Sequence, residues 1–145
     1  MKLALRLCVL IAASAFAASA WAERGTAPQT IAGLGTATFP TSAQSDSAQT
    51  AFMRGLLLLH LFEYPAAAKA FEDAEKLQPD FAMAYWGEAM TYNHGIWNQL
   101  DAGAGRAALA RLGATPAARS AKAPTAREKA YLAAVEILYS GQGTK

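Results

Sequence analysis

A shift of 34 residues brings one apolar helical segment into register with another, and this internal repeat constrains the fold more than any other feature. The aligned pairs are Phe52 with Trp86, Gly55 with Ala89, Leu56 with Met90, Leu58 with Tyr92, and His60 with His94. A period of this length is typical of stacked helix pairs, because a single pair cannot bury its own apolar face. The sequence therefore predicts tandem antiparallel helix pairs.

Helix signals without a strand pattern predict an all-α domain. The expected helices cover residues 46–62, 66–78, 81–93, 106–112 and 126–139, with a short helical turn after Pro116. Short polar side chains accept hydrogen bonds from the exposed N–H groups at helix starts. We therefore expect Asp46 or Ser47 to cap the first helix, Asp80 the third and Thr125 the last, with a loop over residues 94–105 that includes Gly103 and Gly105.

Small residues mark where the helices should approach closely. Gly55, Ala67 and Ala74 leave room for a partner helix, and Phe71 is expected to fill the space between the pair. The acidic residues of the second helix, Glu72, Asp73 and Glu75, fall outside its apolar stripe. Charged residues in such positions are usually solvated, so we expect all three on a wet face.

These residues resemble the tetratricopeptide repeat family. Gly55, Ala67, Phe71, Ala74 and Pro79 have the spacing of one repeat, and Tyr85, Ala89 and Tyr92 continue it into a second. More narrowly, the chain is similar to exported bacterial proteins with such repeats, through Phe39-Pro40-Thr41-Ser42, Phe52-Met53-Arg54-Gly55, Leu59-His60 and Ala82-Met83-Ala84-Tyr85-Trp86-Gly87. The resemblance implies an α-solenoid, here of about two to two and a half repeats. It also implies a non-enzymatic scaffold whose concave groove binds a peptide or partner protein.

The first 22 residues have the features of a cleaved secretory signal peptide. Lys2 and Arg6 are followed by an apolar run that ends in the cleavage pattern Ala20-Trp21-Ala22. That run is shorter than the ~20 residues a spanning helix needs, so no stable membrane anchor is expected after cleavage. The predicted location is the periplasm or the exterior of a bacterial cell.

Two further segments complete the predicted organisation. Residues 23–45 are rich in Gly, Ala, Thr, Ser and Pro, which predicts a flexible linker or arm. Phe39-Pro40 is its one apolar point and could dock on the domain behind it. Residues 46–145 form the predicted helical repeat domain.

Composition excludes several function classes. The chain has 13 basic and 11 acidic residues without a basic cluster, so no nucleic-acid partner is expected. Its single cysteine, Cys8, lies in the signal peptide. Nucleotide-binding, zinc-protease and calcium-loop motifs do not occur, and we expect no catalytic residue, cofactor or bound metal. The alternative is a metal-handling or enzyme-associated exported protein that uses histidine and methionine.

The repeated stripe predicts a partner-binding groove. Residues four apart share one face of a helix, so Phe52, Leu56 and His60 should line up beside Trp86, Met90 and His94, with Met83 and Asn93 adjacent. Alternatively, these rows pack against the arm or a neighbouring helix. Trp97, like Trp86, is either a packing residue or a partner anchor.

The last predicted helix has an apolar face without a following partner. Tyr131, Val135, Leu138 and Tyr139 form that face. A repeat that lacks its neighbour leaves such a face uncovered. We therefore expect either that the 145 residues are a piece of a longer solenoid or that the protein self-associates.

Overall fold

The computed structural model describes residues 23–141, so the predicted signal peptide lies outside the described part of the chain. The described residues are mostly helical. The helices are α1 (Asp46–His60), α2 (Tyr64–Leu77), α3 (Ala82–Met90), α4 (Ala102–Leu112), α5 (Pro116–Ser120) and α6 (Ala126–Tyr139), with a 3-10 turn, η1 (Gly95–Trp97). The strands are β1 (Gln29–Ile31), β2 (Gly35–Ala37), β3 (Asn93–His94) and β4 (Gln99–Leu100).

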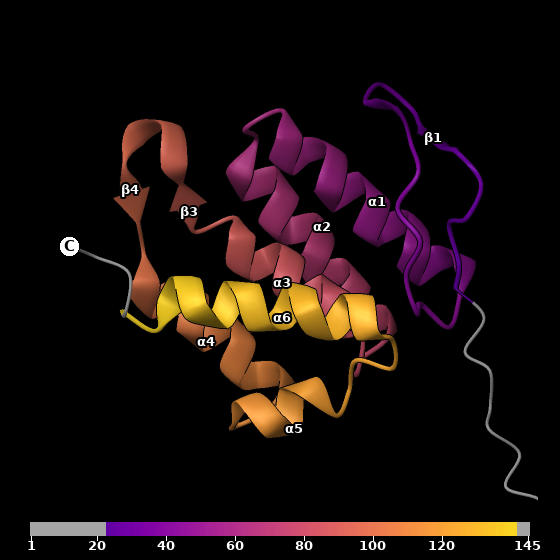
Figure 1. The fold of residues 1–145 in the computed structure, drawn as a ribbon. Helices are drawn as coiled ribbons and strands as arrows, with labels where there is room; N and C mark the ends of the chain where they lie inside the picture. The colour runs from indigo at the N-terminus through magenta and orange to yellow at the C-terminus, as the bar shows by residue number, and fades with distance from the viewer. Residues whose placement is uncertain (1–22, 142–145) are drawn as a thin grey trace, which may run out of the picture.

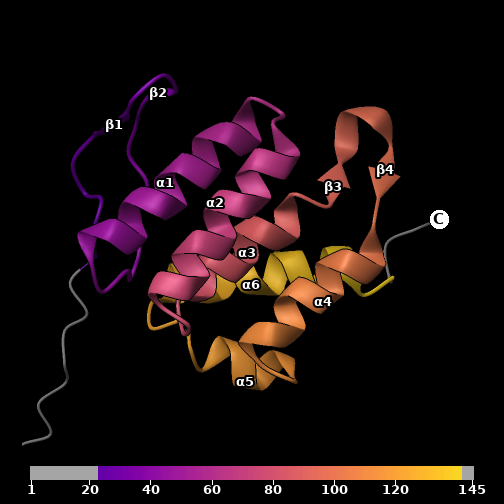
Figure 2. The ribbon, with the colours of Figure 1, turned by 180° about the vertical axis from the view of Figure 1, so that it is seen from behind.

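Helix α3 lies at the centre of the molecule, and all its residues from Ala82 to Ala89 are buried. Its neighbours in space are α1, α2, α4 and α6. Figure 1 shows α6 running across the near side of α3. The opposite view shows α2 and α4 on the other side, with α5 below them (Figure 2). The prediction of adjacent helices packed together is therefore confirmed.

The ring of Phe71 fixes how closely three of these helices approach. Phe71 has no exposed surface. A Cβ added to Gly55 of α1 would lie 2.8 Å from this ring, and one added to Gly87 of α3 would come closer still. Protein interiors are packed too densely to absorb such an overlap without movement. The predicted contact between Gly55 and Phe71 is confirmed, and Gly87 extends it to α3.

Two short antiparallel hairpins differ from the expectation of no strands. In the first, Gln29 of β1 pairs with Ala37 of β2, and the positive φ of Gly33, 77°, accommodates the turn. Ile31 is buried and contributes to the core. The second hairpin joins β3 to β4 around η1. Strands of two or three residues are too short to show the alternation that identifies a strand in sequence.

Two of the three expected helix caps differ in the structure. Ser45, rather than Asp46 or Ser47, caps α1 by accepting from Ala48 N at 3.1 Å. Phe81, rather than Asp80, precedes α3, without a side-chain cap. The Thr125 cap on α6 is confirmed by a bond from Glu128 N at 3.1 Å.

Helix α4 begins four residues earlier than expected, so Gly103 and Gly105 are helical and do not belong to a loop. The Asp101 carboxylate starts the helix by accepting from Ala104 N at 2.9 Å. Gly105 lies against the ring of Tyr139, whose hydroxyl donates to the Ala89 carbonyl. Glycine fits here because the ring leaves no room for a Cβ.

No helix within residues 23–141 is both long and apolar enough to cross a membrane.

Candidate partner-binding site

Four aromatic rings meet where the turn between α1 and α2 faces the β3–β4 hairpin. We call this group, Phe62, Tyr64, His94 and Trp97, the aromatic corner. The Tyr64 and His94 rings stack with centroids 3.9 Å apart. The Trp97 ring meets Phe62 edge-on at 5.7 Å and Tyr64 at 6.1 Å. Such tilted and offset contacts are the arrangements that aromatic pairs prefer.

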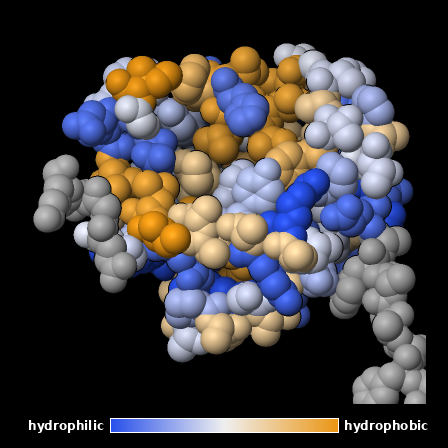
Figure 3. Space-filling model, viewed as in Figure 1, coloured by the Kyte–Doolittle hydropathy of each residue, from blue (hydrophilic) through white to orange (hydrophobic). Residues whose placement is uncertain are grey.

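Much of the aromatic corner is open to solvent. Trp97 is 53% exposed and Phe62 49%, and Ile96 beside them is 69% exposed. Leu61 and Leu100, also exposed, come from the same turn and the same hairpin. Figure 3 shows hydrophobic surface over the hairpin end and over the adjoining helix turn. A contiguous exposed apolar surface of this kind is typical of an interaction site.

Backbone conformation holds two residues of this surface in place. Phe62 has φ 62° and Asn98, next to Trp97, has φ 51°. Asparagine tolerates the left-handed region, whereas a bulky residue such as phenylalanine is an outlier there. Strained residues of this kind concentrate at functional sites. The backbone therefore points Phe62 outward at an energetic cost.

Hydrogen bonding orients His94 within the corner. Its Nε2–H donates to the Thr91 carbonyl at 2.9 Å, which links the ring to the end of α3. The hydrogen bond restrains rotation of the imidazole within its plane, and the Tyr64 ring stacked on one face restrains tilting of that plane. The position of His94 in the corner is thus set by contacts within the chain.

The structure divides the predicted groove between two places. His94 joins the aromatic corner. Phe52 and Met83 have no exposed surface, Leu56 and Trp86 are almost fully buried, Met90 and Asn93 are half-buried, and His60 is exposed. A partner-binding role for these eight residues stays a prediction.

The arm fills the part of the stripe around Phe52 and Trp86. The Phe39 ring lies 5.4 Å from that of Phe52, 6.2 Å from that of Trp86 and 5.5 Å from that of Tyr131 on α6. Around Phe52 and Trp86 the observed arrangement is packing against the arm and α6. The expected docking of Phe39 is confirmed.

A cluster of charged side chains joins α2, α3 and α4. Arg111 lies 3.0 Å from Glu75 Oε2 and also donates to Glu88. Glu75 is buried, so the expectation that it lies on a wet face with Glu72 and Asp73 is wrong. The reason is that α2 is covered on this side by α3 and by the Arg111 side chain.

Glu75 and Glu88 share one arginine, and two buried carboxylates would leave one negative charge unbalanced. Burial therefore favours the protonated form of Glu75. Desolvation first, and then the neighbouring Glu88, raise the pKa of Glu75 to about 8. With that proton in place, one guanidinium balances one carboxylate. The cluster is charge-balanced, and it joins three helices.

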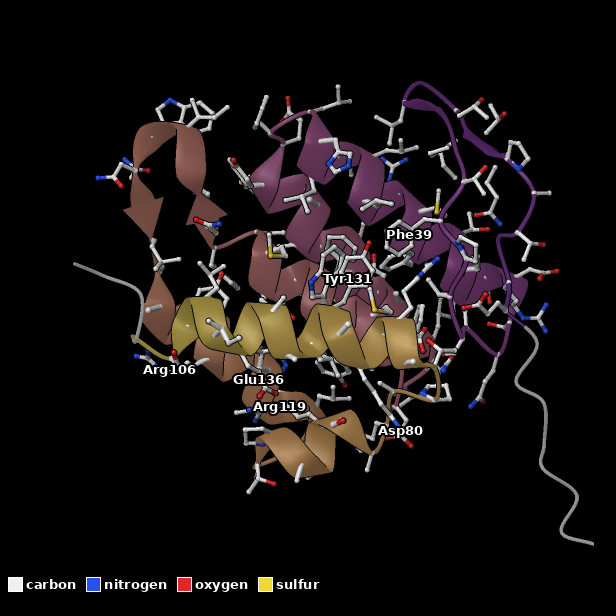
Figure 4. All side chains as sticks on the ribbon, in the orientation of Figure 1. Phe39, Asp80, Arg106, Arg119, Tyr131 and Glu136 are labelled. Atoms are coloured by element: carbon white, nitrogen blue, oxygen red, sulfur yellow. The ribbon has the colours of Figure 1, made fainter. Side chains whose placement is uncertain are left out.

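A hollow of about 650 Å³ lies between α4, α5 and α6. Its walls include Leu109, Pro116 and Ile137. Arg119 and Glu136 in the same wall form an ion pair at 2.8 Å, and Arg106 donates to the Tyr139 carbonyl at 3.1 Å (Figure 4). The charged groups in the wall of this hollow are bonded to other groups of the protein, which favours a structural role for the hollow.

Within the described residues, no three side chains of His, Cys, Asp or Glu are placed to hold a metal ion together. Comparison of the chain with protein-family models, with curated protein sequences and with solved structures finds no match. The fold and site thus define the class only as a mostly helical domain with an exposed aromatic surface.

Sequence reasoning singled out Trp97 and His94 but missed Phe62 and Ile96. Phe62 was expected at the end of the first helix, but α1 ends at His60, and Phe62 therefore lies in the turn that follows. Ile96 lies between a glycine and a tryptophan in the expected loop. A large apolar residue in a loop has no helix face to cover, and this is the signal that could have identified Ile96.

Proposed function

We propose that this protein is an exported, non-enzymatic interaction module of the tetratricopeptide type, and that it binds a partner protein through the aromatic corner. The observation that carries the proposal is the exposure of Trp97, Phe62 and Ile96 where the α1–α2 turn meets the β3–β4 hairpin. Burying large apolar side chains is the main source of affinity in protein association.

The composition of the corner supports a protein partner. Tryptophan and tyrosine are enriched among the residues that dominate binding energy at interfaces. Stacking on Tyr64 and the bond to Thr91 hold His94 before binding. A preformed surface loses less conformational freedom when the partner docks.

The assignment to a repeat module rests on two observations. The 34-residue shift aligns α1 with α3 in sequence, and these two helices pack in the structure. Phe71 contacts glycines on both of them. Export rests on the signal-peptide pattern of residues 1–22.

Substitution of Trp97 by alanine tests the aromatic corner. The purified Trp97→Ala chain and the unaltered chain are cross-linked in envelope extract of the producing organism, and recovered partners are quantified by mass spectrometry. We expect the variant to lose a specific partner by at least about tenfold, the scale of one interface hot spot.

The matched control is Ile137→Ala, because Ile137 is 67% exposed but lies on α6 away from the corner. This variant should recover the same partner as the unaltered chain. Equal recovery by all three chains would rule out the corner as the binding surface. Light scattering of each chain shows whether the partner is a second copy.

A further inference from the structure

Residues 39–42 of the arm lie along the face built by α1, α3 and α6, and the Phe39 ring is their anchor. Three rings surround it, from Phe52, Trp86 and Tyr131. Figure 4 shows Phe39 and Tyr131 next to each other on the side of the molecule that faces the viewer. The Arg127 guanidinium covers the Phe39 ring at 4.8 Å, a favourable cation–π contact.

The backbone of this segment is bound by side chains of the helices. Gln49 Nε2 donates to the Phe39 carbonyl at 3.0 Å, and Arg127 donates to the Pro40 carbonyl. Ser42 N donates to Glu128 Oε1 at 2.8 Å. Side chains from α1 and α6 therefore bind the backbone at three of the four residues 39–42.

The hydroxyl of Thr41 is recognised as well. Its Oγ1–H donates to Gln49 Oε1, so Gln49 contacts both Phe39 and Thr41 through the two ends of one amide. Gln49 and Thr41 are fully buried. A valine at position 41 has nearly the same shape but cannot make this bond.

Proline keeps the segment extended. The residue before a proline is restricted to β or polyproline conformations, so Phe39 cannot enter a helix. Recognition of an extended segment through backbone bonds and a side-chain socket is a common mode of peptide binding.

The arm leaves one acceptor of this face unused. Glu128 is fully buried, and its Oε2 atom has no hydrogen-bond partner among the described residues. A buried acceptor without a donor is costly. A segment with one more donor at this point would satisfy the site better than the arm does.

We propose that the face of α1, α3 and α6 is a recognition site for extended aromatic-Pro-Thr peptide segments, and that residues 39–42 occupy it within the chain. The occupant is a peptide segment of another protein with the same pattern of an aromatic ring, a proline and a hydroxyl. The site lies on a different set of residues from the aromatic corner, so its test is independent of the Trp97 test.

Covalent attachment explains why the arm is the resident ligand. A segment tethered to its site acts at an effective concentration of about millimolar. A peptide in solution therefore competes poorly with an intact arm. Weakening the arm at Phe39 removes its anchor and should open the site to a peptide in solution.

The experiment uses the full chain with Phe39→Ala and a synthetic peptide of residues 36–44, TATFPTSAQ. Binding is followed by tryptophan fluorescence, since Trp86 contacts the ring socket. We expect the peptide to bind the Phe39→Ala chain at least about tenfold more tightly than a peptide with alanine in place of phenylalanine. The unaltered chain, and a Thr38→Ala control chain whose altered residue is exposed, should not bind at the same concentrations.

A folded Phe39→Ala chain, checked by circular dichroism, that binds neither peptide or binds both equally would overturn the proposal. If that chain fails to fold, Phe39→Leu keeps an apolar anchor and is titrated in the same way. Failure of both variants to fold, even with excess peptide, would also overturn it. The arm would then be an integral part of the core instead of a bound segment.

Discussion

The ring of Phe71 controls the spacing of two helices that are far apart in sequence. It contacts Gly55 on α1 and Gly87 on α3, and neither position has room for a methyl group. The approach of α2 to α1 and to α3 thus depends on the absence of a side chain at each glycine.

Gly87→Ala should destabilise the domain by about 1–3 kcal/mol, because the new Cβ overlaps the Phe71 ring and overpacking strains the core. This cost exceeds the gain in helix propensity, at most about 1 kcal/mol. Urea unfolding measures the difference.

Two further variants show whether the loss of stability comes from the contact with Phe71. Gly103→Ala, at an exposed position of α4, should leave stability unchanged or raise it slightly. Adding Phe71→Leu should reduce the cost of Gly87→Ala, because the two residues touch and their effects are then not additive. Full additivity would show that Phe71 does not set the limit.

The buried carboxyl of Glu75 should make stability depend on pH. Its pKa is raised in the folded protein, mainly by burial, so the native state binds a proton that the unfolded state has released. The contribution of Glu75 to stability is therefore fully present below about pH 4.5 and is lost as pH rises towards about 8, a loss of at most about 5 kcal/mol.

Glu75→Gln tests this dependence, because the amide keeps the shape of the protonated acid and does not titrate. Urea unfolding between pH 5 and pH 9 should show a flatter profile for this variant. Glu72→Gln, a half-exposed position of the same helix, should retain the slope of the unaltered chain. An identical slope in the Glu75→Gln chain would contradict a raised pKa for Glu75.

At the scale of elements, Arg111 of α4 joins α2 to α3. Its guanidinium bonds to Glu75 on one helix and Glu88 on the other. A buried carboxylate without its cation is far less stable than the pair. The position of α4 against α2 and α3 therefore depends on this one side chain as well as on apolar packing.

Arg111→Met should cost about 3–5 kcal/mol at pH 8, because it leaves two buried carboxyl groups without a cation. The cost should shrink at pH 5, where the Glu75 carboxyl, whose pKa is raised to about 8, holds its proton. Thermal unfolding at both pH values measures it. Arg54→Met, an exposed position on α1, should change stability by less than about 0.5 kcal/mol. A pH-independent loss would indicate that Arg111 acts only through packing.

At the scale of the whole molecule, the described residues form an arm followed by a helical domain. The arm reaches α6 as well as α1, since Arg127 and Glu128 of α6 bind its backbone. The end of the arm is thus joined directly to the last described helix, and both lie against α3.

Export predicts a defined mature end. Cleavage after the Ala20-Trp21-Ala22 pattern would leave Glu23 as the first residue. Intact mass of protein recovered from the envelope fraction should match a chain that begins there. Replacing Ala20 with a bulky residue should block cleavage, and full-length protein found only in the cytoplasm would contradict export.

The sequence by itself determined the helical class, the positions of most helices and the packing of Gly55 on Phe71. Each of these depends on local periodicity or on residue size, which a single chain displays directly. It also indicated that Phe39 would dock, since an aromatic ring beside a proline in a polar segment has little other use.

Only the tertiary structure decided which surfaces were covered. The stripe of Phe52 and Trp86 has the same sequence pattern whether it is open or occupied, and the arm and α6 occupy it. Glu75 has the pattern of a surface residue, but α3 and Arg111 enclose it. Phe62 and Trp97 meet because a turn and a hairpin distant in sequence converge. Burial depends on contacts between segments far apart in the chain, and local periodicity contains no information about them.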